Sequence, residues 1–147
     1  MRSTKHLIKL ADQGDIDANF ELGYRLAFGK ANSKNPPWKL IFKHWKFAAE
    51  KLHIRAMFYL GVCYDNGYGI KKNIQSAFDW YLKAAKKGHR DSQYNIGFFY
   101  GNGELVKKNH TKKIYWYTLA AKAGLIDAQR DLGYSYFYGQ GVKQDSI

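Results

Sequence analysis

A short stretch recurs four times along the chain at a nearly constant interval, and this repeat restricts the possible folds more than any other feature. The copies are ANFELGYRLAFG from Ala18, AMFYLGVCYDNG from Ala56, SQYNIGFFYGNG from Ser92 and AQRDLGYSYFYG from Ala128, at intervals of 38, 36 and 36 residues. A second pattern runs in phase with the first: HWKFAAEKL from His44, WYLKAAKKG from Trp80 and WYTLAAKAG from Trp116. Periods of this length are typical of solenoids built from one supersecondary unit per repeat. Each unit therefore holds two distinct elements.

Both elements are predicted to be α-helices. Small and apolar residues recur at spacings of three and four, as in Ala56, Leu60 and Tyr64, and neither pattern contains proline. We call helices of the first pattern first-type and those of the second pattern second-type. A glycine follows the second-type pattern in three of four copies, where a left-handed C-cap belongs: Gly14, Gly88 and Gly124. Leu52 replaces it in the remaining copy.

The starts of the second-type helices are predicted from a column of Asn and Asp residues that suit an N-cap: Asn35, Asn73, Asn109 and Asp145. Pro36 is expected at the first helical position of its unit. The predicted layout is a lone second-type helix near residues 3–13, three helix pairs, and a last first-type helix near 126–138. We expect one domain over residues 1–147, with repeats starting near 18, 56, 92 and 128 and a half-repeat at each end.

Glycines inside the first-type helices indicate how the helices pack. Gly61, Gly97 and Gly133 occupy the same repeat position. A glycine within a helix costs about 1 kcal/mol relative to alanine, so close helix packing must offset this.

The pattern A-x-x-x-L-G-x-x-Y-x-x-G-x-G-V followed by W-Y-x-x-A-A-x-x-G resembles the Sel-one-like repeat family, a branch of the tetratricopeptide-like solenoids, over nearly all of the chain. The match is weakest in the first repeat, where Leu26 and Ala31 replace the usual Tyr and Gly. It is strongest in the last repeat, at Ala128, Leu132, Gly133, Tyr136, Gly139, Gly141 and Val142.

The resemblance implies an all-α fold, a right-handed superhelical solenoid of antiparallel helix pairs with about eight helices. It also implies that first-type helices line the concave side and second-type helices the convex side. The family has scaffold and adaptor roles and is often bacterial.

Composition narrows the class of partner. The chain of 147 residues is 46% hydrophobic and 17% aromatic, a content too apolar for disorder. Its net charge of +12 favours acidic partners. No apolar run reaches the roughly 20 residues that cross a bilayer, and no signal peptide is recognisable, so we expect a cytoplasmic protein without a membrane span. Cys63 is the only cysteine, so no internal disulfide can form.

The stretch YDNGYGIKKN at residues 64–73 places two glycines ahead of two lysines, as a phosphate-binding loop could. It returns as YGNGELVKKN from Tyr100 and, in reduced form, as YFYGQGVKQD from Tyr136. A P-loop follows a strand and contains G-x-x-x-x-G-K-[ST], which does not occur in this chain. A structural role is therefore favoured over anion binding.

Residues that could support catalysis are not arranged for it. Cys63 suits a buried apolar position better than a nucleophile, and most carboxylates fall at helix starts, where they favour the helix dipole. The histidines show no metal-binding spacing: His6, His44, His53, His89 and His110. We predict no enzymatic activity, no cofactor and no metal.

The predicted binding surface lies on the first-type helices. Two positions form a stripe, expected to be partly core and partly exposed: Phe20, Tyr24, Phe58, Val62, Tyr94, Phe98, Arg130 and Tyr134. The adjacent position varies in chemistry, so we expect it to face a partner: Glu21, Tyr59, Asn95 and Asp131. Lysines of the connecting loops are expected to form a basic rim: Lys71, Lys72, Lys107, Lys108 and Lys143.

The sequence thus predicts a protein–protein interaction module, a scaffold or adaptor, that binds an acidic protein through its concave groove and basic rim. One alternative is an immunity or inhibitor protein that neutralises a toxin or effector. A second is a basic solenoid that binds nucleic acid, which is disfavoured because basic and aromatic residues are predicted on different faces. Nothing in the sequence specifies the oligomeric state.

Overall fold

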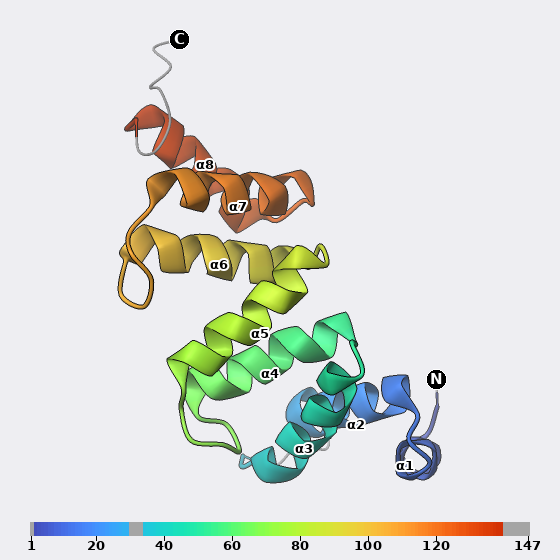
Figure 1. The fold of residues 1–147 in the computed structure, drawn as a ribbon. Coiled ribbons are helices and arrows are strands. Elements are labelled where there is room, and N and C mark those ends of the chain that lie inside the picture. Colours follow the sequence, from blue (N-terminus) through green and yellow to red (C-terminus); the bar gives the residue numbers. More distant parts are fainter. Residues whose placement is uncertain (1, 30–33, 140–147) are drawn as a thin grey trace. The chain divides into compact units, whose positions relative to one another are not determined.

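The computed structural model describes residues 2–29 and 34–139, and in these ranges every regular element is a helix. The all-α prediction is therefore confirmed (Figure 1). The helices are α1 (Thr4–Asp12), α2 (Ile16–Phe28), α3 (Trp38–Glu50), α4 (Ile54–Asn66), α5 (Ile74–Lys86), α6 (Arg90–Asn102), α7 (His110–Lys122) and α8 (Ile126–Phe137). First-type helices are α2, α4, α6 and α8, and second-type helices alternate with them.

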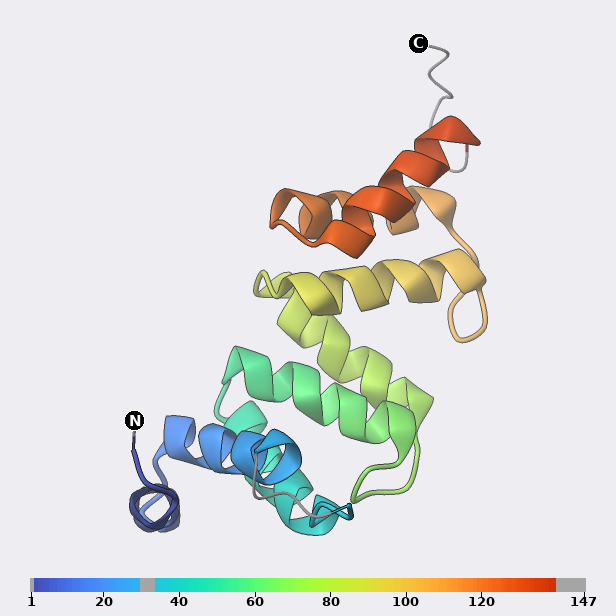
Figure 2. The same ribbon diagram turned by 180° about the vertical axis from the view of Figure 1, so that it is seen from behind.

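The helices form two compact units that divide within α5, after Trp80. In the first unit, α1 packs on α2, α2 on α3 and α3 on α4. In the second unit, α6 packs on α7 and α7 on α8, as both views show (Figures 1 and 2).

Glycines within the first-type helices leave room for a large ring of the following second-type helix. A Cβ built on Gly23 would lie 2.5 Å from Trp45 Nε1, and that nitrogen donates a hydrogen bond to Phe20 O at 3.2 Å. A Cβ on Gly97 would lie 2.5 Å from Tyr117 Cδ1, which confirms the packing predicted for this glycine. Gly133 differs, because no described atom lies within 4 Å of a Cβ built there.

The second-type helices end as predicted. Gly14, Gly88 and Gly124 have φ of +85°, +94° and +95°. Leu52 adopts the same left-handed conformation, with φ of +70°. The backbone conformation at this position is therefore the same in all four copies, although the Cβ of leucine disfavours it.

Two of the predicted N-caps are confirmed. Asn73 and Asn109 accept from the backbone N–H groups of Ser76 and Lys112, at 3.0 and 2.9 Å. Asp145 lies outside the described residues.

The predicted start of α3 is wrong, because this helix begins at Trp38 with Pro37 as its N-cap and no side-chain cap. A residue that precedes proline is disfavoured in the α region. Asn35 and Pro36 both precede a proline, so the helix begins only after the second proline.

A repeated hydrogen bond that the sequence patterns did not indicate joins three of the four first-type helices, α2, α6 and α8, to the end of the preceding second-type helix. In α4 the equivalent residue is Met57, which has no amide group. The side-chain amides of Asn19, Gln93 and Gln129 donate to the carbonyl oxygens of Ala11, Ala85 and Ala121. These carbonyls belong to the last turn of a helix, where no intrahelical donor is available. The amides therefore stabilise the helix ends and the helix pairing together.

Candidate functional site

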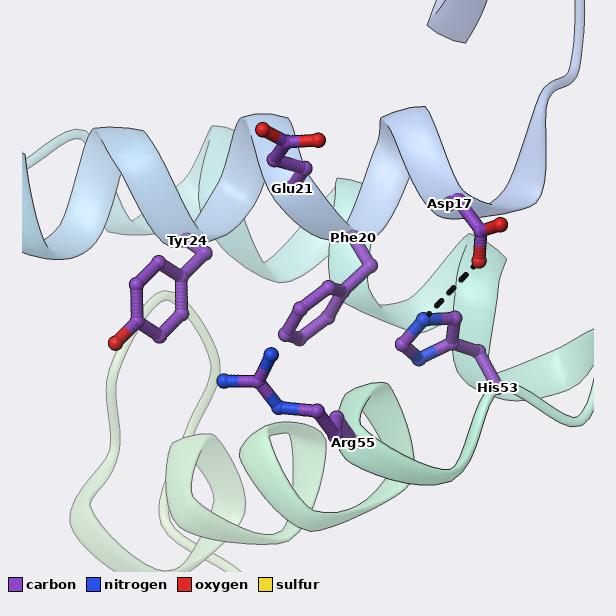
Figure 3. Close-up of a pocket in the computed structure, with 6 residues that line it drawn as sticks. All are labelled: Asp17, Phe20, Glu21, Tyr24, His53 and Arg55. Atoms are coloured by element: carbon purple, nitrogen blue, oxygen red, sulfur yellow. Dashed lines mark ion pairs between the residues drawn. The ribbon is translucent and has the colours of Figure 1, made fainter. Parts of the chain in front are cut away.

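An open pocket of about 360 Å³ lies in the first unit, between α2 and the start of α4 (Figure 3). Its lining combines aromatic rings, carboxylates and cationic groups: Asp17, Phe20, Glu21, Tyr24, His53 and Arg55. The first-type helix α2 supplies four of these side chains, and the other two, His53 and Arg55, come from the start of α4. Phe20 and Tyr24 point toward Arg55, whereas Glu21 points away from it (Figure 3).

Arg55 extends across the aromatic rings of α2 (Figure 3). The carbon of its guanidinium group lies 4.9 Å from the ring centroid of Phe20 and 5.3 Å from that of Tyr24. The His53 ring stacks on Phe20, with centroids 4.5 Å apart. Ring contacts of this kind hold the guanidinium in place while leaving its N–H groups able to donate.

Arg55 forms no ion pair with any described carboxylate. Glu21 is paired with Arg25 at 2.9 Å and with Arg2 at 3.6 Å, and Asp17 lies 3.4 Å from His53 Nε2. The pocket therefore contains a positioned cation whose charge no carboxylate of the described chain pairs with.

His53 links the pocket to the start of α4. Its Nδ1 accepts a hydrogen bond from Ala56 N at 3.1 Å, so the ring proton lies on Nε2, facing Asp17. Burial lowers the pKa of His53, and the nearby Asp17 carboxylate only partly opposes this shift. The neutral ring that caps α4 is thus the favoured form at neutral pH.

Behind the pocket, the aromatic residues of the first unit form a continuous cluster. Tyr59 stacks on Trp45 with centroids 5.0 Å apart and makes an edge contact with Phe58. Tyr24 contacts Phe28 and Tyr59 through ring edges.

The predicted residues Phe20, Glu21, Tyr24, Phe58 and Tyr59 therefore come together on one side of this unit. They differ in exposure: Phe20 is 6% exposed and Tyr24 is 36% exposed. Tyr59 is half-buried and packs against several rings, so its truncation would remove core contacts as well as surface.

The predicted residues of the second unit form another group. The Tyr94 ring stacks on Tyr117 with centroids 5.0 Å apart, and its hydroxyl donates to Asp131. Burial, together with this carboxylate, raises the pKa of Tyr94 to about 12. Asp131 also pairs with Arg130. Three other predicted residues lie in α6 and α8: Asn95 is half-buried, whereas Phe98 and Tyr134 are exposed.

The predicted rim lysines are exposed where the structure describes them. Lys71 and Lys72 lie between α4 and α5, and Lys107 and Lys108 lie between α6 and α7. Lys143 lies outside the described residues.

The two connecting loops share a backbone hydrogen bond and a left-handed glycine. Asn73 N donates to Tyr64 O at 2.8 Å, and Asn109 N donates to Tyr100 O at 2.9 Å. Gly67 has a φ of +76°, a left-handed conformation that glycine adopts without strain. The repeated geometry supports the structural interpretation of the glycine loop.

The predicted separation of basic and aromatic residues onto different faces is wrong. Arg55 packs on Phe20 and Tyr24, and Lys112 Nζ lies 5.1 Å from the ring centroid of Tyr100. Long cationic side chains contact rings on neighbouring helices. The type of helix that carries a residue therefore does not determine which side chains it contacts.

Arg55 and His53 were not identified from the sequence as binding residues, although the repeat alignment carries a signal for Arg55. Its position is occupied by Asp17, Asp91 and Asp127 in the other first-type helices. A carboxylate in the first turn is stabilised by the helix dipole, whereas a cation there is disfavoured. Arg55 therefore departs from the preference for acidic residues at a helix start, and such departures are frequent at functional sites.

Other candidate chemistry in the described residues is limited. Cys63 is buried, and burial raises the pKa of its thiol to about 12, which agrees with its predicted packing role. Within residues 2–29 and 34–139, no group of three or more His, Cys, Asp or Glu side chains could hold a metal ion. In the same ranges, no helix has the length and apolar character needed to cross a membrane.

Comparison with known proteins gives consistent matches. The model of the Sel1 repeat family matches residues 16–36, 54–89, 90–125 and 126–147. No curated protein matches the chain.

Several solved structures are similar. A protective antigen of uropathogenic Escherichia coli that displays an SLR fold is 34% identical, with a TM-score of 0.89 over 99% of this chain and 31% of that chain. A Sel1 repeat protein from Oxalobacter formigenes is 34% identical, with a TM-score of 0.86 over 97% of this chain and 58% of that chain. Helicobacter pylori cysteine rich protein B is 26% identical, with a TM-score of 0.66 over 89% of this chain and 98% of that chain. The chain thus spans about a third of the length of the first of these structures and just over half of the second.

Proposed function

Because the chain belongs to the Sel1 repeat family, we propose that it is a protein–protein interaction module, a scaffold or adaptor, that binds an acidic protein. Proteins with Sel1 repeats are generally interaction scaffolds, and the repeat is typically non-enzymatic. The proposal adds the acidic character of the partner and the surface that receives it, which is the pocket between α2 and α4.

The observation that carries the proposal is the position of Arg55. Its guanidinium group rests on two aromatic rings and has no carboxylate partner among the described residues. A carboxylate from a partner protein would complete this site with a charge-assisted hydrogen bond, and the rings would limit access of water. Arginine and aromatic residues are also the types that most often dominate the energetics of interfaces.

The net charge of +12 acts in the same direction at longer range. A positive field speeds the approach of an acidic protein, and Arg55 then makes a specific contact.

The test is capture of a partner by the immobilised protein, followed by titration with the purified partner in a calorimeter. Arg55→Gln keeps most of the side-chain stem but removes the charge, so we expect affinity for the captured partner to fall about tenfold or more. Arg90→Gln is the matched control, since Arg90 is an exposed arginine at the start of the next first-type helix. That variant should bind normally.

Equal affinity of the wild type and Arg55→Gln would overturn the proposed site. Recovery of nucleic acid instead of protein, with affinity that falls steeply as salt is added, would overturn the proposed class of partner.

A further inference from the structure

Two basic pockets lie next to each other in the second unit, at the turn between α6 and α7. The first, of about 450 Å³, is lined by Tyr100, Val106, Lys107, Lys108, Asn109 and Lys112. The second, of about 320 Å³, is lined by Phe98, Gly101, Asn102, Lys108, His110, Lys113 and Tyr117. Lys108 belongs to both pockets, and neither is lined by a carboxylate.

The basic groups of these pockets are a departure from the repeat. The equivalent turn between α4 and α5 has the same pair of lysines, Lys71 and Lys72, in a loop of the same length. Around it, however, the preceding repeat has Asp65, Ile74, Ser76 and Ala77 where this repeat has Gly101, His110, Lys112 and Lys113. Three basic side chains are gained, whereas the number of carboxylates is unchanged, because Glu104 stands in the loop where the preceding repeat has Tyr68.

Lys113 and Gly101 both differ from the equivalent residues of the preceding repeat, and they lie against each other. A Cβ built on Gly101 would lie 2.8 Å from Lys113 Cδ, so the absence of a side chain makes room for the lysine stem. The Lys113 ammonium lies 5.8 Å from the ring centroid of Tyr117. Burial lowers the pKa of Lys113, and the Asp131 carboxylate of α8 opposes this shift. The lysine is therefore held across α6 with part of its hydration removed.

The basic residues that distinguish this repeat lie at a helix start, where positive charge destabilises the protein in the absence of a ligand. His110, Lys112 and Lys113 lie at the first turn of α7, which contains no acidic residue. The amino end of a helix carries a partial positive charge, so cations there are repelled and an anion is attracted. His110 Nδ1 is also buried and has no hydrogen-bond partner among the described residues. An anionic ligand would relieve the charge repulsion.

Most aromatic rings of these pockets are covered by other side chains, which favours a peptide ligand over a nucleic acid. Stacking of bases requires exposed rings along the groove. The Tyr117 ring stacks on Tyr94, and Lys112 covers the ring of Tyr100. Of the aromatic rings that line these pockets, Phe98 is the most exposed, at 53%.

We propose that these two pockets, joined at Lys108, bind two neighbouring carboxylate side chains of an acidic peptide segment. One carboxylate lies among Lys107, Lys108 and Lys112, and the other lies between Lys108 and Lys113. This site rests on the proposed function in that the segment belongs to a protein partner, but it is separate from the pocket at Arg55.

The binding of a fluorescent oligoglutamate peptide, followed by anisotropy, tests the site directly. Lys108→Gln with Lys112→Gln changes two exposed lysines, and we expect affinity to fall about tenfold or more. Lys71→Gln with Lys72→Gln removes the same charge from exposed lysines of the equivalent turn, so affinity should change less than about twofold. Lys113→Met, which keeps an unbranched stem over Gly101, should weaken binding in a fold that circular dichroism shows to be intact.

Three results would overturn the inference: no measurable binding of the peptide, equal losses in the two double-lysine variants, or tighter binding of single-stranded DNA that the Lys108 variant abolishes. Arg55→Gln separates this inference from the proposed function, since that variant should bind oligoglutamate normally while losing its protein partner. Suppose that both double-lysine variants lose the same affinity for oligoglutamate, and that the variant with Lys108→Gln and Lys112→Gln still binds the protein partner with full affinity. This result would refute the two-pocket site but would not contradict the proposed function.

Discussion

Leu52 shows how strongly the repeat controls the backbone of a single residue. It occupies the position that glycine holds in the other repeats, and its φ is +70°. A residue with a Cβ pays about 1–2 kcal/mol to adopt this left-handed conformation. Its backbone N–H donates to Ala49 O at 3.0 Å, so the turn forms in spite of the strain. At 65% exposed, the side chain recovers little through burial.

Leu52→Gly is therefore expected to stabilise the protein. Relief of the left-handed strain outweighs the greater flexibility of glycine in the unfolded chain, for a net gain of about 1 kcal/mol. Urea unfolding followed by circular dichroism measures this change. Lys51→Gly is the control, because Lys51 has a φ of −95° and should lose stability on the same substitution. A lower urea midpoint for Leu52→Gly would contradict the strain argument.

At the scale of helices, equivalent glycines have different surroundings. Gly97 faces the ring of Tyr117 and the backbone of Lys113, whereas Gly133 faces no described atom within 4 Å. The same residue in the same repeat position is thus required by packing in α6 and not in α8. The difference lies in the neighbouring helix, since α7 follows α6 and covers this face.

The two glycines make a matched pair for mutation to alanine. Gly97→Ala should lower the free energy of unfolding by about 1–3 kcal/mol, because the added methyl group collides with Tyr117. Gly133→Ala should raise it by up to about 1 kcal/mol, since alanine favours the helix and meets no described atom. Thermal unfolding of both variants measures the two effects. A similar loss in both would show that α8 is covered on this face, and no loss at Gly97 would refute the packing register.

At the scale of the whole molecule, half-buried histidines make the stability depend on pH. Burial is the largest cause that lowers the pKa values of His44, His53 and His110 below their ordinary value of 6.5. Between the folded and unfolded values, the unfolded chain binds more protons than the folded chain. These groups therefore contribute their full stability above pH 6.5, and the contribution is lost as the pH falls through the lowered values.

We expect the free energy of unfolding to decrease as the pH is lowered from 8 to 5, a range chosen to span the ordinary histidine pKa. His53→Asn should make this decrease shallower, because asparagine can also cap α4 but does not take up a proton. His6→Asn, at an exposed residue of α1, serves as the control and should leave the slope unchanged. An identical slope in the wild type and His53→Asn would show that His53 does not contribute to the acid sensitivity.

By itself the sequence determined the elements, their order and the family. A period near 36 residues, helical spacing within each copy and glycines at fixed ends act locally, so they specify helices and turns without knowledge of the neighbours. Local chemistry also explains the late start of α3, since two prolines in succession disfavour the α conformation in the residues before them.

Only the tertiary structure decided which of the patterned residues are buried and which side chains meet. Phe20 and Tyr24 belong to one stripe and line one pocket, yet Phe20 is 6% exposed and Tyr24 is 36% exposed. The difference arises from their neighbours, since the His53 ring stacks on Phe20. Arg55 reaches the rings of α2, and Lys113 crosses Gly101 of α6, through contacts between residues that are far apart in the chain or on different helices. A periodic pattern specifies which face of a helix is apolar, but the exposure of each side chain depends on the helix packed against it.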